Sequence, residues 1–336
     1  MKKTITIRSF AKVNLSLDVG APRADGMHPV DTVMQLIGIG DDVKVSVCAR
    51  SEAEDKAEDP VDRIFVTTDL TALQAGGHVT EDLPADRGNI AYRAAERMTE
   101  HFREAAGRKA APVIHIEITK RIPIAAGLAG GSGNAAAVLH ALNVLWNLDL
   151  SLTEIMKIAA DLGSDVPFCA AGMVAGNREV LPARLVRDPL ASPCGRGRGT
   201  GTEVEPLPAW DSAVVIAKPD IGMSTAAVYR GFDRCIVSKR PDNDALAQAL
   251  AAGDRAGVYR QMINVLELYS LVAAPQIQQL KTRMEQEAGA DSFVLMSGSG
   301  PTVYALLASD EAAARCQAAL AAEGWQAYNG RTLTGR

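Results

Sequence analysis

The spacing of hydrophobic and polar residues divides the first 120 residues into short strands and one long helix. Apolar and polar positions alternate over residues 4–9 and 13–19, which predicts two strands interrupted at residues 10–12. Apolar side chains recur at helical spacing over residues 89–106, which predicts an amphipathic helix. Further strands are predicted at residues 32–37, 42–47, 63–67 and 113–119.

Helices and strands continue to mix in the rest of the chain, which predicts the α+β class. A buried helix is predicted within residues 122–146 because this stretch is rich in alanine and leucine. Ser151 with Glu154 has the spacing of a capping box, so the next helix is expected to begin there and end near residue 162. Later strands are predicted at residues 214–219, 293–296, 303–307 and near 325, and later helices at residues 224–232, across 244–287 and at 310–322.

A chain of 336 residues is long enough for two domains. We expect an N-terminal domain over residues 1–177 and a C-terminal domain over residues 209–336. Residues 178–208 lie between them and contain several arginines and prolines and the run CGRGRGTGTE, which predicts a mobile insertion rather than an RNA-binding segment. Residues 51–59 carry five acidic side chains against one lysine and predict a solvated loop.

A glycine-rich loop precedes the predicted buried helix. Four glycines lie between residues 127 and 133, and the N-cap of the helix is expected at Ser132 or Gly133. Glycines allow positive φ and close approach of the backbone to a ligand, and the first N–H groups of a helix attract an anion. The pattern predicts a phosphate-binding loop, and the alternative is a glycine-bearing turn before a core helix. The Gly-Lys-Ser/Thr and Gly-x-Gly-x-x-Gly patterns of common nucleotide sites do not occur here.

Composition narrows the possible partners. The hydrophobic content of 47% and the charged content of 22% are ordinary for a globular protein. The net charge of −5 argues against binding of nucleic acid or a membrane surface through bulk charge. The five cysteines form no Cys-x-x-Cys pair, which fits a reducing cytoplasm, and no apolar run reaches the roughly 18 residues of a membrane span.

Three polar residues are candidates for chemistry, and each also has an ordinary structural interpretation. Lys12 lies between apolar neighbours and could be a solvated strand residue. His28 lies in a turn-rich loop, where a histidine is often incidental. Asp165 follows a helix in an otherwise apolar setting, so it could cap the next turn or act in a reaction.

Three segments of the chain together resemble the motifs of the GHMP small-molecule kinase superfamily. They are FAKVNLSL at residues 10–17, IPIAAGLAGGSGNAAA at residues 122–137 and LMSGSGPTVYAL at residues 295–306. The resemblance implies a two-domain α+β fold with the active site in the cleft between the domains. It also implies ATP as the co-substrate, with Mg²⁺ as its expected companion and metal ligands that the resemblance does not identify.

Two further segments, residues 22–43 and 162–172, are similar to members of this superfamily that phosphorylate an alcohol bearing cytidine diphosphate in the non-mevalonate isoprenoid pathway. This resemblance implies that Asp165 is the catalytic base and that Lys12 acts beside it. Asn14, Met27 and His28 match positions that bind the substrate. The positions that match the ATP site are Asn89, Lys120, Pro123, Ala125, Ala126, Gly127, Leu128, Ala129, Gly130, Gly131 and Ser132.

The chain also departs from the family pattern. Met27 stands where the family often has tyrosine, and Gly133 stands where a second serine is frequent. Two alternatives remain open: a kinase of the same superfamily for another small alcohol, as in homoserine or mevalonate-type kinases, and a non-catalytic nucleotide-binding homologue. The Arg-Ala-Asp-Gly-x-His segment argues against the first, and the presence of both Lys12 and Asp165 argues against the second.

Overall fold

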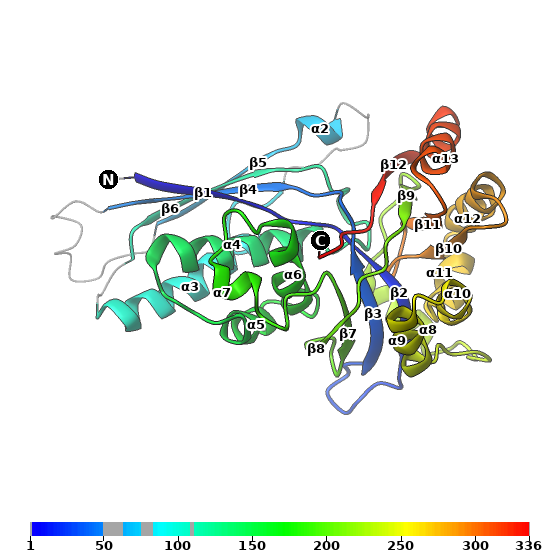
Figure 1. Cartoon of the computed structure of the whole chain (residues 1–336), viewed down its shortest axis with the longest axis horizontal. Coiled ribbons are helices and arrows are strands. Elements are labelled where there is room, and N and C mark those ends of the chain that lie inside the picture. Colours follow the sequence, from blue (N-terminus) through cyan, green and yellow to red (C-terminus); the bar gives the residue numbers. More distant parts are fainter. Residues whose placement is uncertain (1, 50–62, 75–82, 108–110, 336) are drawn as a thin grey trace. The chain divides into compact units, whose positions relative to one another are not determined.

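A computed structural model describes residues 2–49, 63–74, 83–107 and 111–335 of the chain. The loop predicted at residues 51–59 lies outside these described residues. The chain divides into two compact units, whose elements are drawn in Figure 1. Unit 1 comprises the described residues of Met1–Phe10, Gly40–Ile122 and Gly130–Ala191, and unit 2 comprises those of Ala11–Ile39, Pro123–Ala129 and Ser192–Arg336.

Unit 1 contains a four-stranded sheet in the order β1-β4-β6-β5. Strand β5 runs parallel to β6, and the other neighbours are antiparallel. Helices α3 and α4 cover one face of this sheet (Figure 1). The strands are β1 (Lys2–Arg8), β4 (Asp42–Cys48), β5 (Ile64–Asp69) and β6 (Val113–Thr119). The helices are α2 (Thr71–Gln74), α3 (Ile90–Ala106), α4 (Gly130–Trp146), α5 (Leu152–Ala160), α6 (Val166–Gly172), the 3₁₀ helix η1 (Met173–Gly176) and α7 (Ala183–Val186).

Helix α4 is buried along nearly its whole length, as the sequence predicts, and packs against α3, α6, β1 and β4. Its His140 is fully buried, and Nε2 donates to the Ala170 carbonyl of α6 at 2.8 Å. Burial lowers the pKa of His140 to about 4, so the imidazole is neutral at pH 7. The helix begins at Gly130, so the N-cap predicted at Ser132 or Gly133 is wrong. A Cβ at Gly130 would lie 3.0 Å from Ile122 Cγ2, so glycine lets the first turn begin against the preceding segment.

Unit 2 contains two antiparallel four-stranded sheets, in the orders β2-β3-β7-β8 and β10-β11-β9-β12. The second sheet packs with helices around an apolar core. The strands are β2 (Lys12–Val19), β3 (Val30–Leu36), β7 (Cys194–Arg198), β8 (Glu203–Leu207), β9 (Ala213–Lys218), β10 (Phe293–Met296), β11 (Val303–Leu307) and β12 (Gln326–Arg331). The helices are α8 (Thr225–Phe232), α9 (Asn243–Ala252), α10 (Arg255–Gln261), α11 (Glu267–Ala273), α12 (Pro275–Ala288) and α13 (Asp310–Ala322). None of the helices in the described residues combines the length and the apolarity that crossing a membrane requires.

Residues 178–208, which the sequence predicts as a mobile insertion, contain regular secondary structure. They include α7 and the two strands β7 and β8, and β7 pairs with β3. Residues 11–39 also belong to unit 2, because β2 pairs with β3 and so joins the ladder that contains β7. The compact units are therefore interleaved along the chain and do not follow the continuous division at residues 177 and 209.

Two helices of unit 1 begin with a side-chain cap. The capping box of α5 is present as predicted, because the Ser151 side chain accepts from Glu154 N and the Glu154 side chain accepts from the backbone N–H of Ser151. Asn89 caps α3 by accepting from Ala91 N at 3.0 Å. Both caps satisfy N–H groups that have no partner inside the helix.

The two sheets of unit 2 are joined by a buried hydrogen bond from Tyr304 of β11 to β2. Tyr304 is fully buried, and its hydroxyl donates to the Asn14 carbonyl at 2.8 Å. Burial raises the pKa of Tyr304 well above its usual value, so the phenol stays protonated as this donor requires.

We expect Tyr304→Phe to lower the free energy of unfolding by about 1–3 kcal/mol, because the buried Asn14 carbonyl loses its donor. Urea denaturation monitored by circular dichroism measures this change. Tyr328→Phe is the matched control, since Tyr328 is partly exposed on β12 of the same sheet. An equal loss in both variants would contradict a specific role for the Tyr304 hydroxyl.

Candidate active site

Three segments that are far apart in the sequence meet in unit 2. The backbone N–H of Lys12 donates to the Leu128 carbonyl at 3.0 Å. Ser297 Oγ donates to the Gly127 carbonyl at 3.0 Å. The structure thus brings together the start of β2, the Pro123–Ala129 part of the glycine loop and the Ser/Gly loop that follows β10.

The glycine loop approaches the Ser/Gly loop so closely that Gly127 cannot carry a side chain. A Cβ at Gly127 would lie 2.5 Å from the Ser297 carbonyl oxygen and 2.9 Å from that of Gly300. Its φ is +71°, and the non-glycine residues Ala125 and Ala129 also have positive φ, at 51° and 54°. Alternating left-handed residues of this kind are uncommon outside glycine and turn successive N–H groups in new directions. The loop geometry therefore suits a backbone anion site.

The Lys12 side chain is held by a chain of buried hydrogen bonds. Lys12 Nζ donates to Asn14 Oδ1 at 2.6 Å, and Asn14 Nδ2 donates to Thr32 Oγ1 at 2.8 Å. The Thr32 hydroxyl in turn donates to the Ser16 carbonyl at 2.6 Å. Each of these residues is at most 4% exposed, so the interpretation of Lys12 as a solvated strand residue is wrong. A buried ammonium needs partners of this kind.

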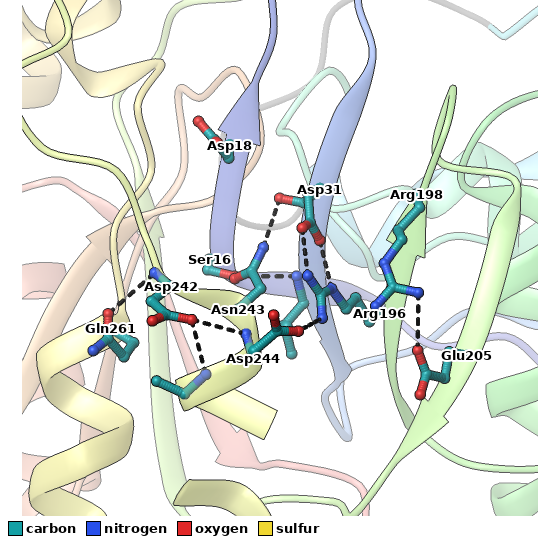
Figure 2. Close-up of polar contacts among 12 residues, drawn as sticks. Ser16, Asp18, Asp31, Arg196, Arg198, Glu205, Asp242, Asn243, Asp244 and Gln261 are labelled. Carbon is teal, nitrogen blue, oxygen red and sulfur yellow. Dashed lines mark hydrogen bonds and ion pairs between the residues drawn. The ribbon is translucent and has the colours of Figure 1, made fainter. Parts of the chain in front are cut away.

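A second polar network lies beside this chain and is shown in Figure 2. Ser16 Oγ donates to Asn243 Oδ1, Asn243 Nδ2 donates to the Asp31 carbonyl, and Arg196 binds the Asp31 carboxylate through two nitrogens at 2.7 and 2.6 Å. Burial alone would raise the pKa of Asp31, but the hydrogen bonds from Arg196 and Asn243 outweigh it and lower that pKa. Arg196 comes from the segment that the sequence predicts as an insertion, and it anchors β7 to β3.

Met27 and His28, which are predicted with Asn14 to bind the substrate, are exposed to different degrees. Met27 is 49% exposed. The His28 side chain is only 8% exposed, with Nε2 2.7 Å from the Asp233 carboxylate and its ring edge-on to Tyr229. The carboxylate can only accept, so Nε2 carries a proton. The His28 orientation is fixed by Tyr229 within α8 and by Asp233 immediately after it.

Lys120, predicted in the nucleotide pocket, forms a buried ion pair in unit 1. Its ammonium contacts the Asp41 carboxylate, and the two side chains are 4% and 0% exposed. The other Asp41 oxygen accepts from the backbone N–H groups of Arg121 and Ile122 at 2.7 and 2.8 Å. A Cβ at Gly130 would lie 3.1 Å from Lys120 Nζ, so this ammonium lies beside the first residue of α4.

Ile90 connects the other predicted residues of unit 1. A Cβ at Gly131 would lie 3.4 Å from Ile90 Cγ2, and one at Gly163 would lie 3.7 Å from Ile90 Cδ1. The start of α4, the Asn89 cap of α3 and the loop that leads to Asp165 therefore surround one side chain. Asp165 is half-buried at the N-terminus of α6, and its side chain makes no capping hydrogen bond, so the capping interpretation is wrong.

The predicted site residues divide between the units. Lys12, Asn14, Met27 and His28 belong to unit 2 with Pro123, Ala125, Ala126, Gly127, Leu128 and Ala129, whereas Asp165 belongs to unit 1 with Asn89, Lys120, Gly130, Gly131 and Ser132. The joint action of Lys12 and Asp165 therefore stays a prediction, as do the ligand contacts of all these residues.

Sequence reasoning did not identify several residues that shape these regions. Asp41 lies just before one predicted strand and Thr32 at the start of another, and only their partners, far away in sequence or on the neighbouring strand, show what they do. Asp233 lies at the end of a helix, and its local sequence did not indicate that it binds His28. Ser297 was the exception, because the run Ser-Gly-Ser-Gly-Pro already marked its loop. In the described part of the chain, no group of three or more His, Cys, Asp or Glu side chains could hold a metal ion.

Comparison with known proteins shows the family to which the chain belongs. The model of the GHMP kinases N terminal domain matches residues 89–173, and that of the GHMP kinases C terminal domain matches residues 239–326. A solved homoserine kinase from Cytophaga hutchinsonii has the same fold, with a TM-score of 0.67 and 20% identity over 100% of this chain and 97% of its own. The fold and the two matches define the class as ATP-dependent small-molecule kinases of the GHMP type.

Two similar curated proteins share one name. The 4-diphosphocytidyl-2-C-methyl-D-erythritol kinase of Brevibacillus brevis is 39% identical over 90% of this chain and 87% of its own length, and that of Geobacillus kaustophilus is 39% identical over 91% and 89%. A crystal structure of 4-(cytidine 5'-diphospho)-2C-methyl-D-erythritol kinase superposes with a TM-score of 0.70 and 27% identity, covering 98% of this chain and 99% of the other. The chain therefore belongs to the 4-diphosphocytidyl-2-C-methyl-D-erythritol kinase family of the GHMP kinases.

We expect Asp41→Asn to lower the free energy of unfolding by about 3–5 kcal/mol, because it leaves the buried Lys120 ammonium without a counter-charge. The double variant Asp41→Asn with Lys120→Met should recover most of the loss, since neither charge then remains. Urea denaturation of the single and double variants measures both effects.

The neighbouring aspartate provides the control for this experiment. Asp42 pairs with Arg121 at the surface, where the two side chains are 38% and 44% exposed, so Asp42→Asn should have little effect. A double variant no more stable than Asp41→Asn would show that the loss does not come from an unpaired charge.

Proposed function

We propose that the protein transfers the γ-phosphoryl group of ATP to the 2-hydroxyl of 4-diphosphocytidyl-2-C-methyl-D-erythritol, in the non-mevalonate route to isoprenoid precursors. The observation that carries the proposal is the meeting of Lys12, the Pro123–Ala129 loop and the Ser297 loop in unit 2. The names of the curated relatives at 37–39% identity support the choice of alcohol. A cytoplasmic location belongs to the same proposal and rests on the sequence alone.

Asp165 acts as the general base in this proposal. Its carboxylate accepts the proton of the substrate hydroxyl while the oxygen forms a bond to the γ-phosphorus. The bond between the γ-phosphorus and the β–γ bridging oxygen breaks, and ADP leaves with that oxygen. Support for this role comes from the segment at residues 162–172, in which Asp165 matches the position of the family's catalytic aspartate.

Lys12 supplies positive charge in the same reaction. A nearby ammonium favours the ionised form of a carboxylate and offsets the negative charge of a phosphoryl group in transfer. The hydrogen bond from Lys12 Nζ to Asn14 Oδ1 holds one of the three ammonium protons, so the ammonium has a defined orientation.

The ATP phosphates are proposed to lie against the glycine loop and the start of α4. Helix α4 is 17 residues long and has no acidic residue in its first turn, so no carboxylate of that turn opposes the attraction of its macrodipole for an anion. Mg²⁺ would enter with ATP, since this ion is commonly bound by phosphate oxygens, waters and one or two carboxylates rather than by a full protein cage. When bound, it neutralises phosphate charge.

The decisive test is an ADP-release assay with purified protein, ATP, Mg²⁺ and a panel of alcohols. We expect turnover with 4-diphosphocytidyl-2-C-methyl-D-erythritol and at least 100-fold lower kcat/KM with homoserine and mevalonate, because a site that binds the cytidine group loses those contacts with the smaller alcohols. A higher kcat/KM with homoserine or mevalonate would contradict the proposed substrate. No turnover with any alcohol would favour the non-catalytic alternative.

Asp165→Asn should reduce kcat by about 100- to 10,000-fold, the range associated with general acid–base groups, while ATP binding survives. Steady-state kinetics and isothermal titration with a non-hydrolysable ATP analogue measure the two quantities. Asp161→Asn is the matched control, because Asp161 lies nearby in sequence but forms an exposed pair with Arg97. Comparable turnover in Asp165→Asn and the wild type would remove Asp165 as the base.

His28→Ala should raise KM for the cytidine-bearing alcohol roughly 5- to 100-fold with a smaller change in kcat, because hydrogen bonds to the base are lost. Met27→Tyr should preserve or tighten binding, since an aromatic ring can stack on the pyrimidine whereas the thioether contributes less. Initial-rate measurements over a range of alcohol concentrations separate KM from kcat. An unchanged KM in His28→Ala would contradict its place in the cytidine site.

A further inference from the structure

The hydrogen bonds from Lys12 to Ser16 form a chain, here called the Lys12 relay, whose members are Lys12, Asn14, Thr32 and Ser16. The three bonds are 2.6, 2.8 and 2.6 Å long. All four residues lie on β2 and β3, and their exposed fractions are 4%, 3%, 4% and 0%. The relay is therefore shielded from water, and its groups depend on one another for hydrogen bonds.

Donor and acceptor chemistry gives the relay a single direction. An ammonium has only protons to give, so Lys12 must face the oxygen of the Asn14 amide and not its nitrogen. The amide nitrogen then points to Thr32, whose oxygen accepts. The Thr32 hydroxyl also has one proton to donate, and it donates this proton in a hydrogen bond to the Ser16 carbonyl, which can only accept.

Thr32 is the member that decides the orientation of the Asn14 amide. If its oxygen were absent, the Asn14 NH₂ group would be buried without an acceptor, and a flip of the amide would bring two groups of donors, NH₂ and NH₃⁺, face to face. Both arrangements are unfavourable in a low-dielectric interior. The amide and the ammonium would therefore lose their fixed geometry together.

The far end of the relay is held in place by further contacts of Ser16. The register of β2 against β3 shifts between Asn14 and Ser16, which is the mark of a β-bulge. Ser16 Oγ accepts from Val33 N at 3.2 Å and donates to Asn243 Oδ1, and Asn243 continues to Asp31 and Arg196 (Figure 2). The carbonyl that Thr32 binds therefore sits on a rigid support.

We infer that Thr32 is a positioning residue for phosphoryl transfer. Through Asn14 it fixes the orientation of the Lys12 ammonium and so the directions of the two N–H groups that Asn14 does not bind. The inference rests on the proposed function, because it gives the ammonium a task in that reaction. Thr32 acts on Lys12 only through Asn14, to which it is hydrogen-bonded.

Replacement of the Thr32 hydroxyl tests the inference. Thr32→Val keeps the shape and removes the donor and acceptor, and we expect kcat to fall roughly 10-fold, as one misplaced hydrogen bond would produce, with KM for ATP within about twofold of the wild type. Thr32→Ser restores the hydroxyl and should keep kcat within about twofold. A Thr32→Val enzyme with wild-type kcat, or a Thr32→Ser enzyme as slow as Thr32→Val, would overturn the inference.

The control for a purely structural loss is Thr99→Val. Thr99 is fully buried in α3, and its hydroxyl donates to the Ala95 carbonyl at 2.8 Å. This variant should lose stability to a similar extent and keep its kcat. If Thr32→Val does not fold, Thr32→Ala replaces it in every comparison, because it also lacks the hydroxyl.

A double variant shows whether Thr32 acts through Asn14. In an Asn14→Ala background, Thr32→Val should lower kcat by less than about twofold, because the amide that it orients is gone. A full 10-fold loss in that background would mean that Thr32 acts by another route and would overturn the inference.

An NMR measurement tests the relay without any substrate. The side-chain NH₂ signals of Asn14, assigned by their loss in Asn14→Ala, should exchange slowly with water in the wild type and in Thr32→Ser, and quickly in Thr32→Val. If the wild type fails to phosphorylate the cytidine-bearing alcohol, the proposed function fails while slow exchange still supports the relay. Fast exchange in the wild type would overturn the relay whatever alcohol the enzyme uses.

Discussion

Backbone meets backbone at Gly127, and this close approach constrains much of unit 2. The Ser297 and Gly300 carbonyls lie where a side chain of residue 127 would have to be, so the glycine loop can take its place only with glycine there. In the same loop, the Leu128 carbonyl accepts a hydrogen bond from the Lys12 backbone N–H, and the Gly127 carbonyl accepts one from the Ser297 hydroxyl. One position without a side chain therefore allows three distant segments to share a single region, and the Lys12 side chain is placed by the strand that begins there.

Burial of polar groups is the second theme of unit 2. Lysine, asparagine, threonine and serine side chains would be costly inside a protein if they lacked partners. Along β2 and β3 each of them instead finds a partner of the required kind, and the bulge in β2 lies within this set. A fully satisfied network of this kind is stiff, because movement of one group leaves the next without its hydrogen bond. Such stiffness suits a site that must hold a charge in a fixed direction.

In unit 1 a buried ammonium is stabilised by an ion pair. Asp41 binds the Lys120 ammonium and two consecutive backbone N–H groups, so it fixes the chain immediately before the glycine loop. Gly130 and Gly131 then allow α4 to start close to Lys120 and Ile90. The positive end of α4 and the Lys120 ammonium thus lie together, and the charge of that ammonium is balanced by Asp41.

Local patterns in the sequence were sufficient for features that depend on a few neighbouring residues. Alternation located strands β1 to β6, the Ser151 and Glu154 spacing located a capping box, and the apolar run after the glycines identified α4 as buried. The three motifs at residues 10–17, 122–137 and 295–306 indicated the class of kinase through their resemblance to the motifs of the GHMP superfamily.

Features that depend on pairing between distant residues were decided only by the tertiary structure. Residues 194–198 look like a polar, glycine-rich loop, yet they form strand β7. They do so because their backbone pairs with β3 and because Arg196 binds the Asp31 carboxylate. Residues 11–39 join unit 2 for the same reason, and the direction of the Asn14 amide is determined by Thr32 across the sheet. The sequence determines which side chains are available for such contacts. Which of them meet depends on strand register and burial, since a lysine or threonine has the same local pattern whether its partner is water or a buried carbonyl.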